Sequence, residues 1–141
     1  MKRSILAFAL IPLAYSVQAK EMKQHKDVTV TPVLKSDQTI TGQPINLPKG
    51  DVQVSVSKYE IAPGATLPVH KHLYPRYAYV LEGTLRVSNE DTGKNQVFKA
   101  GDFIIESINQ WHKGANIGSD PVKLLVIDQV KKGESNVILQ K

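Results

Sequence analysis

The sequence predicts an all-β protein whose single domain is a barrel or sandwich of short strands. A length of 141 residues favours one domain. No segment after residue 50 repeats its apolar residues at the helical period. Instead, short β-rich runs follow one another at near-regular spacing and are separated by turn signals. Many short strands of this kind are typical of sandwiches and barrels.

The strands are expected at the β-rich runs, and the turns at the glycine-containing and polar segments between them. Residues 52–57 alternate apolar and polar side chains, which is the period of a half-buried strand. Residues 77–81 and 84–88 are separated at Gly83 and predict a bent or hairpin pair. Further strands are expected at residues 96–99, 102–106, 112–115 and 122–127.

The first nineteen residues have the layout of a secretory signal peptide. Lys2 and Arg3 precede a short apolar stretch, and small residues lead to a cleavage point after Ala19. The apolar stretch is shorter than the ~20 residues that span a bilayer, so no stable membrane anchor is expected after cleavage. We therefore predict a periplasmic or secreted protein.

The remaining chain divides into an N-terminal arm at residues 20–50, a barrel at residues 51–130 and a C-terminal segment at residues 131–141. Pro32, Pro44 and Pro48 oppose a long helix in the arm. Short strands are expected there around residues 28–34 and 43–47.

Composition excludes several classes of function. There is no cysteine, which removes disulfides, thiolate metal sites and cysteine nucleophiles. The formal net charge is +5, but the lysines are scattered along the chain. Nucleic-acid binding requires a basic face, and we expect no nucleic-acid partner.

Three histidines form a candidate metal site within the β-rich region. His70 and His72 lie two residues apart, so on a strand both point to one face. His112 opens a later strand that can return beside them. Neutral imidazole binds Fe, Mn, Ni, Zn and Cu. The alternative is that the three are unrelated surface or core histidines.

The spacing around these histidines resembles the two sequence motifs of the cupin superfamily, which are small jelly-roll β-barrels. The first motif reads G, five residues, H-x-H, three or four residues, E, six residues, G. The matching positions here are Gly64, His70, His72, Arg76 and Gly83. Every spacing fits, and Arg76 replaces the glutamate. In the second motif Gly101, His112 and Asn116 stand, while Ser107 and Asn109 replace its proline and glycine.

The resemblance covers about residues 50–127 and implies a cupin barrel and, with it, a homodimer. It also implies that His70, His72 and His112 are the metal ligands, without the carboxylate that usually completes the set. Three interpretations of Arg76 stay open. The arginine anchors an anionic substrate beside a bound metal, it forms an anion pocket with metal-free histidines, or it turns away to pair with Glu82 or Glu106.

Two functions from different classes fit this pocket. The first is a metal-dependent oxygenase, isomerase or lyase for a small anionic or enolizable substrate, with Arg76 as the catalytic residue that holds the substrate's negative group. The second is a periplasmic binding protein or sensor that uses the same cavity without turnover. A structural role through dimerisation is a third. Phe103 and Ile105 share a face that we expect to line the cavity.

Overall fold

The computed structural model describes residues 27–141. The predicted signal peptide at residues 1–19 and the beginning of the arm lie outside the described residues. The chain divides into two units, Met1–Thr31 and Pro32–Lys141, and residues 27–31 of the first contain neither helix nor strand. Across the described part, no helix is long and apolar enough to cross a membrane.

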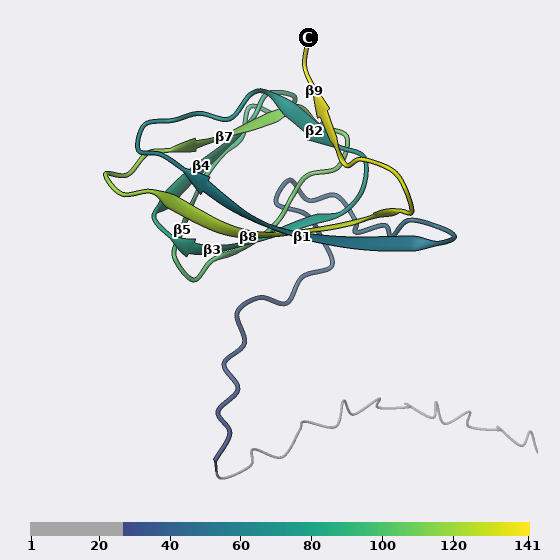
Figure 1. Cartoon of the computed structure of the whole chain (residues 1–141), viewed down its shortest axis with the longest axis horizontal. Coiled ribbons are helices and arrows are strands. Elements are labelled where there is room, and N and C mark those ends of the chain that lie inside the picture. The colour runs from purple at the N-terminus through teal and green to yellow at the C-terminus, as the bar shows by residue number, and fades with distance from the viewer. Residues whose placement is uncertain (1–26) are drawn as a thin grey trace, which may run out of the picture. The chain divides into compact units, whose positions relative to one another are not determined.

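Residues 27–141 form an all-β fold, which confirms the predicted fold class. Two antiparallel sheets face one another, one with the order β1-β8-β3-β6 and the other with the order β5-β4-β7-β2-β9 (Figure 1). The strands are β1 (Val52–Ile61), β2 (His70–His72), β3 (Arg76–Glu82), β4 (Thr84–Asn89), β5 (Asn95–Lys99), β6 (Phe103–Ile105), β7 (His112–Asn116), β8 (Val122–Lys131) and β9 (Val137–Leu139).

The core lies between the two sheets, because each long strand turns one apolar face inward. In β8 every second residue is buried, from Val122 to Val130. The inward residues of β3, beside β8 in the same sheet, and those of β4, in the other sheet, join this row in the core. The buried cluster comprises Ile61, Ala78, Val80, Leu85, Val87, Ile104, Val122, Leu124 and Val126.

Gly83, between β3 and β4, shows why the sequence places a glycine at this bend. Its φ is 82°, in the left-handed region that favours glycine. A Cβ there would lie 2.7 Å from the Pro121 carbonyl oxygen and 2.9 Å from the Val122 Cα. Both the backbone conformation and the close approach of the chain therefore require glycine.

The arm contains less strand than the sequence predicts. Residues 28–34 form no strand, and among the described residues of the arm the β-pairing is one isolated bridge between Gln38 and Pro44. Prolines lack the amide hydrogen that a strand ladder needs, which explains the difference. Gln43 instead fastens the arm to the barrel, since its Nε2 donates to the Ile108 carbonyl at 2.8 Å and its Oε1 accepts from the Ile108 amide at 2.9 Å.

The C-terminal segment contributes a strand to the second sheet. β9 pairs with β2, and His70 and His72 lie opposite Leu139 and Val137 respectively. β2 has only three residues, and this pairing, one pair to β7 and a bridge between His72 and Ile108 hold the two histidines in position.

β6 turns inward the face opposite to the one that the sequence predicts. Ile105 pairs with Tyr77, and Phe103 pairs with Tyr79, on the outer side of the first sheet. Ile104 is fully buried in the core instead. The expectation that Phe103 and Ile105 line the cavity is therefore wrong, because a three-residue strand is too short for its inward phase to be read from sequence.

Candidate metal site

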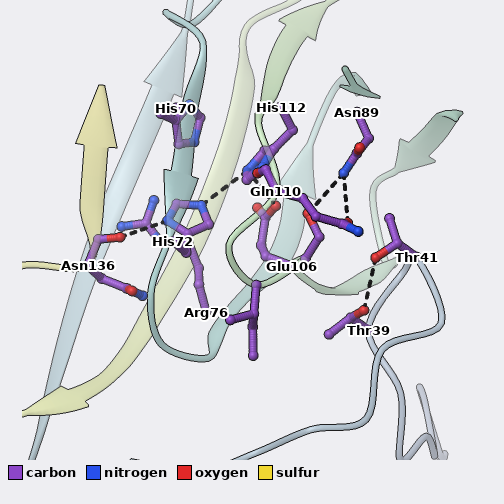
Figure 2. A network of polar contacts seen from close by, with 12 residues as sticks. Thr39, Thr41, His70, His72, Arg76, Asn89, Glu106, Gln110, His112 and Asn136 are labelled. Carbon is purple, nitrogen blue, oxygen red and sulfur yellow. Dashed lines mark hydrogen bonds and ion pairs between the residues drawn. The ribbon is translucent and has the colours of Figure 1, made fainter. Parts of the chain in front are cut away.

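His70, His72 and His112 meet inside the barrel (Figure 2). His70 and His72 are both on the inner face of β2, and His112 at the start of β7 is the direct cross-strand partner of His70. The ring centroids are 4.6 to 4.9 Å apart. His72 and His112 are 0% and 2% exposed, and His70 is 8% exposed.

Backbone carbonyls fix which ring nitrogen of each histidine carries the hydrogen. His70 Nδ1 lies 2.8 Å from the Pro68 carbonyl oxygen, and His112 Nδ1 lies 2.8 Å from the Gln110 carbonyl oxygen. His72 Nδ1 lies 3.2 Å from the carbonyl oxygen of Asn136. A carbonyl only accepts, so each Nδ1 donates, and each neutral ring keeps its lone pair on Nε2. This is the orientation that histidine ligands of metals usually have.

The environment favours uncharged imidazoles at two of the three positions. Burial, followed by the charge of Arg76 and the neighbouring histidines, lowers the pKa of His72 to about 2. Burial also lowers the pKa of His70, although its bond to the Pro68 carbonyl opposes the effect. Neutral rings are the form in which histidine binds a metal.

Arg76 points into the barrel and is paired with Asp128. Its Nε donates to Oδ1 of Asp128 at 2.7 Å, and its Nη2 donates to Oδ2 at 2.8 Å. The side chains are only 7% and 11% exposed. Burial alone would lower the pKa of Arg76, but the bonds to Asp128 outweigh it and raise the pKa. The guanidinium is therefore charged, and its partner is neither Glu82 nor Glu106.

Asn136 connects this ion pair to the histidines. Its Nδ2 donates to Asp128 Oδ1 at 2.6 Å, and its backbone carbonyl accepts from His72. The same side chain also bonds to both backbone groups of Tyr74. One residue thus fixes the loop after β2, the orientation of His72 and the carboxylate that neutralises Arg76.

Glu106 is the acidic side chain beside the histidines. Its Oε2 lies 3.4 Å from His112 Nε2, and its side chain is 12% exposed. Among the described residues, Glu106 Oε2 is a buried oxygen with no hydrogen-bond partner. Figure 2 shows its carboxylate directed toward His112.

The interior next to these groups is small. A cavity of about 20 Å³ is lined by His70, Arg76, Glu106 and His112 together with apolar core residues. That volume accommodates about one water molecule. A larger pocket of about 400 Å³ lies at the surface against the arm and contains none of the three histidines.

The donor atoms fit a transition metal. The three ligand nitrogens all lie within 4.8 Å of one another, and the two Nε2 atoms of His72 and His112 are 3.2 Å apart. Ligand atoms ~2.1 Å from a tetrahedral ion lie about 3.4 Å from one another. Two lone pairs that face each other at this distance do not form a hydrogen bond, whereas a cation between them satisfies both.

The departures from the second motif have local explanations. Asn109 replaces a glycine and has φ 54°, a left-handed conformation that asparagine adopts more readily than most residues. Its amide donates to the His72 carbonyl at 2.7 Å, so this turn also supports the site. Ser107 accepts from Asn89 Nδ2 at 3.2 Å. Asn116 donates to the carbonyls of Ile61 and Asp120, which is a structural role.

Sequence reasoning did not assign Asp128, Asn136 or the position of Glu106. A signal for Asp128 existed, because it is the one charged residue in phase with the apolar alternation of β8. Glu106 had no such signal, because sequence periodicity does not determine the inward phase of the three-residue strand before it. Nothing comparable marks Asn136, which lies beyond the predicted barrel.

Comparison with known proteins agrees with this architecture. The family model described as Cupin domain matches residues 57–128. No curated protein sequence matches the chain. Among solved structures, the chain is similar to the oxalate decarboxylase of Lactobacillus farciminis in its formate complex, with 26% identity, a TM-score of 0.53, and coverage of 61% of this chain and 26% of that one.

Two further structures share the fold. The polyketide cyclase RemF from Streptomyces resistomycificus has 18% identity and a TM-score of 0.53, over 85% of this chain and 87% of that one. The DMSP lyase DddQ from Ruegeria pomeroyi has 17% identity and a TM-score of 0.53, over 62% and 43% of the two chains. This chain thus spans about a quarter of the length of the oxalate decarboxylase and less than half of the lyase. With motif spacing, sheet topology and family model in agreement, the chain belongs to the cupin superfamily.

Proposed function

We propose that this cupin binds a divalent transition metal, Fe, Mn, Ni, Zn or Cu, on His70, His72 and His112. The observation that carries the proposal is the arrangement of the three imidazoles, whose Nδ1 atoms face backbone carbonyls while their ligand nitrogens converge within 4.8 Å. Random surface histidines would show neither the common tautomer nor the shared burial.

We further propose that the metal site acts on a small carboxylate or a similarly small enolizable molecule. Such a metal, when bound, acts as a Lewis acid that polarises an oxygen of its ligand. One observation supports a substrate of few atoms: the solved oxalate decarboxylase, at 26% identity, carries formate. The reaction class stays within oxygenase, isomerase or lyase.

The second candidate function is a non-catalytic small-molecule binder or sensor. The ion pair between Arg76 and Asp128 favours it, because a guanidinium that already holds a carboxylate is less available to a substrate anion. The role of Arg76 as a catalytic anchor remains a prediction. Incubation of the Mn²⁺-loaded protein with oxalate and other small carboxylates, followed by NMR, separates the two functions, since a binder leaves every compound unchanged.

The test of metal binding is the metal content of the purified mature protein after dialysis against each ion. About one ion per chain is expected for the wild type. His70→Ala should weaken binding by about 100-fold or more, because even loss of a residue behind the ligands costs 10- to 100-fold. His25→Ala is the control, because His25 is the one histidine of the sequence outside both motifs, and this variant should bind as the wild type does. A wild-type chain that takes up no ion contradicts the proposal.

We also propose that two copies associate through the outer face of the first sheet. β1 lies at the edge of that sheet, and its Val52, Val54 and Val56 are 42%, 58% and 59% exposed. Tyr77 and Tyr79 continue the apolar surface on β3. Exposed apolar faces and long free edges are usual sites of association. Light scattering on the mature protein measures the oligomeric state.

Export is the remaining part of the proposal. The supporting feature is the basic, apolar and small-residue pattern of residues 1–19. Intact-mass analysis of the protein recovered from the periplasm or medium should give a chain that begins at Lys20. Recovery of the uncleaved chain from the cytoplasm would contradict it.

A further inference from the structure

Glu106 is an acid with a buried carboxylate oxygen that neither the sequence motifs nor the three-histidine proposal assigns. Its Oε2 has no hydrogen-bond partner among the described residues, although a buried, unpaired carboxylate oxygen is costly. Such an oxygen is expected either to bind a cation or to accept a proton from a neighbour. The surrounding geometry distinguishes these two roles.

Glu106 lies opposite Arg76, at the position that follows β6. β3 and β6 are antiparallel, with Tyr77 opposite Ile105, so the next pair in the same register is Arg76 and Glu106. The Glu106 amide donates to the Arg76 carbonyl at 2.9 Å. Both side chains line the interior cavity with His70 and His112. A carboxylate therefore lies one strand away from the position where the cupin motif has its glutamate.

The distances between Glu106 and the histidine nitrogens fit ligands that share one ion. Glu106 Oε2 to His112 Nε2 is 3.4 Å, and His112 Nε2 to His72 Nε2 is 3.2 Å. Both match the ~3.4 Å that separates two ligands of one four-coordinate ion. A direct hydrogen bond from His112 to Glu106 would require a doubly protonated ring, because His112 Nδ1 already faces the Gln110 carbonyl.

The charges around the three histidines favour a carboxylate ligand. Asp128 holds the Arg76 guanidinium in a two-pronged ion pair, which neutralises the cation that lines the same cavity. Three neutral imidazoles would leave the full charge of a divalent ion inside the barrel. One carboxylate ligand reduces that net charge to +1. This lowers the free-energy cost of placing the ion inside the barrel, since an unmatched buried charge is costly.

We propose that Glu106 is the fourth protein ligand of the metal. In this chain the carboxylate is supplied from the position after β6 instead of from β3, and Asp128 neutralises the arginine at the motif's glutamate position. The inference rests on the proposed metal site, and it extends that site to a donor set of three nitrogens and one oxygen.

The experiment measures Co²⁺ binding to the purified mature protein by calorimetry and by the visible absorption of bound Co²⁺. Glu106→Gln keeps the shape of the side chain and removes the ligand charge. We expect its Co²⁺ affinity to fall at least 10-fold and its visible spectrum to change. Glu82→Gln is the matched control, because Glu82 is an exposed glutamate paired with Lys123 at 2.8 Å. The control should bind Co²⁺ as the wild type does.

Thermal unfolding of the metal-free proteins separates a ligand from a structural residue. A ligand role predicts that Glu106→Gln is as stable as the wild type or more stable, since the variant removes a buried anion. If Glu106 instead pairs with a charged His112, the variant loses stability near pH 6 and keeps its Co²⁺ affinity, which overturns the inference. Glu106→Ala is the second variant should the glutamine variant not fold, and the same loss of affinity is expected.

The outcomes also separate this inference from the proposed function. Tight Co²⁺ binding by the wild type with unchanged binding by Glu106→Gln overturns the fourth ligand and leaves the three-histidine site standing. Absence of Co²⁺ binding by the wild type overturns both. Tight binding by the wild type that weakens in both Glu106 variants, and in neither His25→Ala nor Glu82→Gln, supports both.

Discussion

The buried ion pair between Arg76 and Asp128 makes a sharp prediction about stability. Asp128→Asn keeps the size of the side chain but leaves the Arg76 guanidinium without its counter-charge. The pair is 7% and 11% exposed and is bonded at 2.7 and 2.8 Å, so little solvent screens it. Removal of one partner from such a pair costs about 3 to 5 kcal/mol.

Urea unfolding of the metal-free protein, followed by circular dichroism, measures this free-energy cost, and thermal unfolding measures the matching fall in unfolding temperature. At ~4 °C for each kcal/mol in a domain of this size, the unfolding temperature should fall by about 12 to 20 °C. The double variant Arg76→Met/Asp128→Leu should recover most of the loss, because well-packed apolar residues often replace a buried ion pair without penalty. Glu90→Gln is the matched control, since its pair with Lys113 is 37% and 40% exposed.

Two results would refute this reasoning. One is an Asp128→Asn variant as stable as Glu90→Gln, which would mean that Arg76 does not depend on Asp128. The other is a double variant whose loss of stability equals the sum of the losses of Arg76→Met and Asp128→Leu alone, which would mean that the two side chains contribute independently. Either result would remove the explanation of how a cation is tolerated beside the histidines.

Three further predictions concern pH, the bend at Gly83 and the outer sheet face. Because burial lowers the pKa of His72 to about 2, the unfolded chain takes up a proton near pH 6.5 that the folded chain does not. The metal-free protein should therefore lose about 1.4 kcal/mol of stability for each pH unit below ~6.5, and a flat urea midpoint from pH 7.5 to 5 would contradict this. Gly101→Ala should cost about 1 to 2 kcal/mol of stability for its left-handed φ alone. Gly83→Ala should cost more, because its Cβ would also meet the Pro121 carbonyl oxygen at 2.7 Å. Equal urea midpoints of the two variants would argue against that contact. Val54→Lys should convert a dimer to a monomer in light scattering without loss of the fold, and a variant that still dimerises would exclude this face.

Much of the fold was predictable because its signals are local. Alternation in residues 52–57 and the glycines at the bends identify strands and turns from neighbours in sequence. The spacing of His70 and His72 also places both side chains on one face without knowledge of the fold. The match to both cupin motifs then predicted that His112 returns to the same place, as the structure shows.

The partner of Arg76 was not predictable in the same way. Asp128 lies 52 residues further along the chain, and only the register between β3 and β8 brings the two side chains together. Glu106 depends on the phase of a strand of three residues, which sequence periodicity does not determine. Asn136 requires the return of the C-terminal segment beside β2. Each of these contacts is set by tertiary packing rather than by local pattern.

A crystal structure of the Co²⁺-loaded protein, with the metal located by its anomalous scattering, would show whether the three histidines and Glu106 bind one ion. One ion is expected, bound by Nε2 of His70, His72 and His112 and by a carboxylate oxygen of Glu106, at the ~2.0 to 2.2 Å typical of nitrogen and oxygen ligands. Arg76 should remain paired with Asp128. An ion bound elsewhere, or none at all, would contradict the metal site, and an ion held by the three histidines with Glu106 turned away would contradict the fourth ligand.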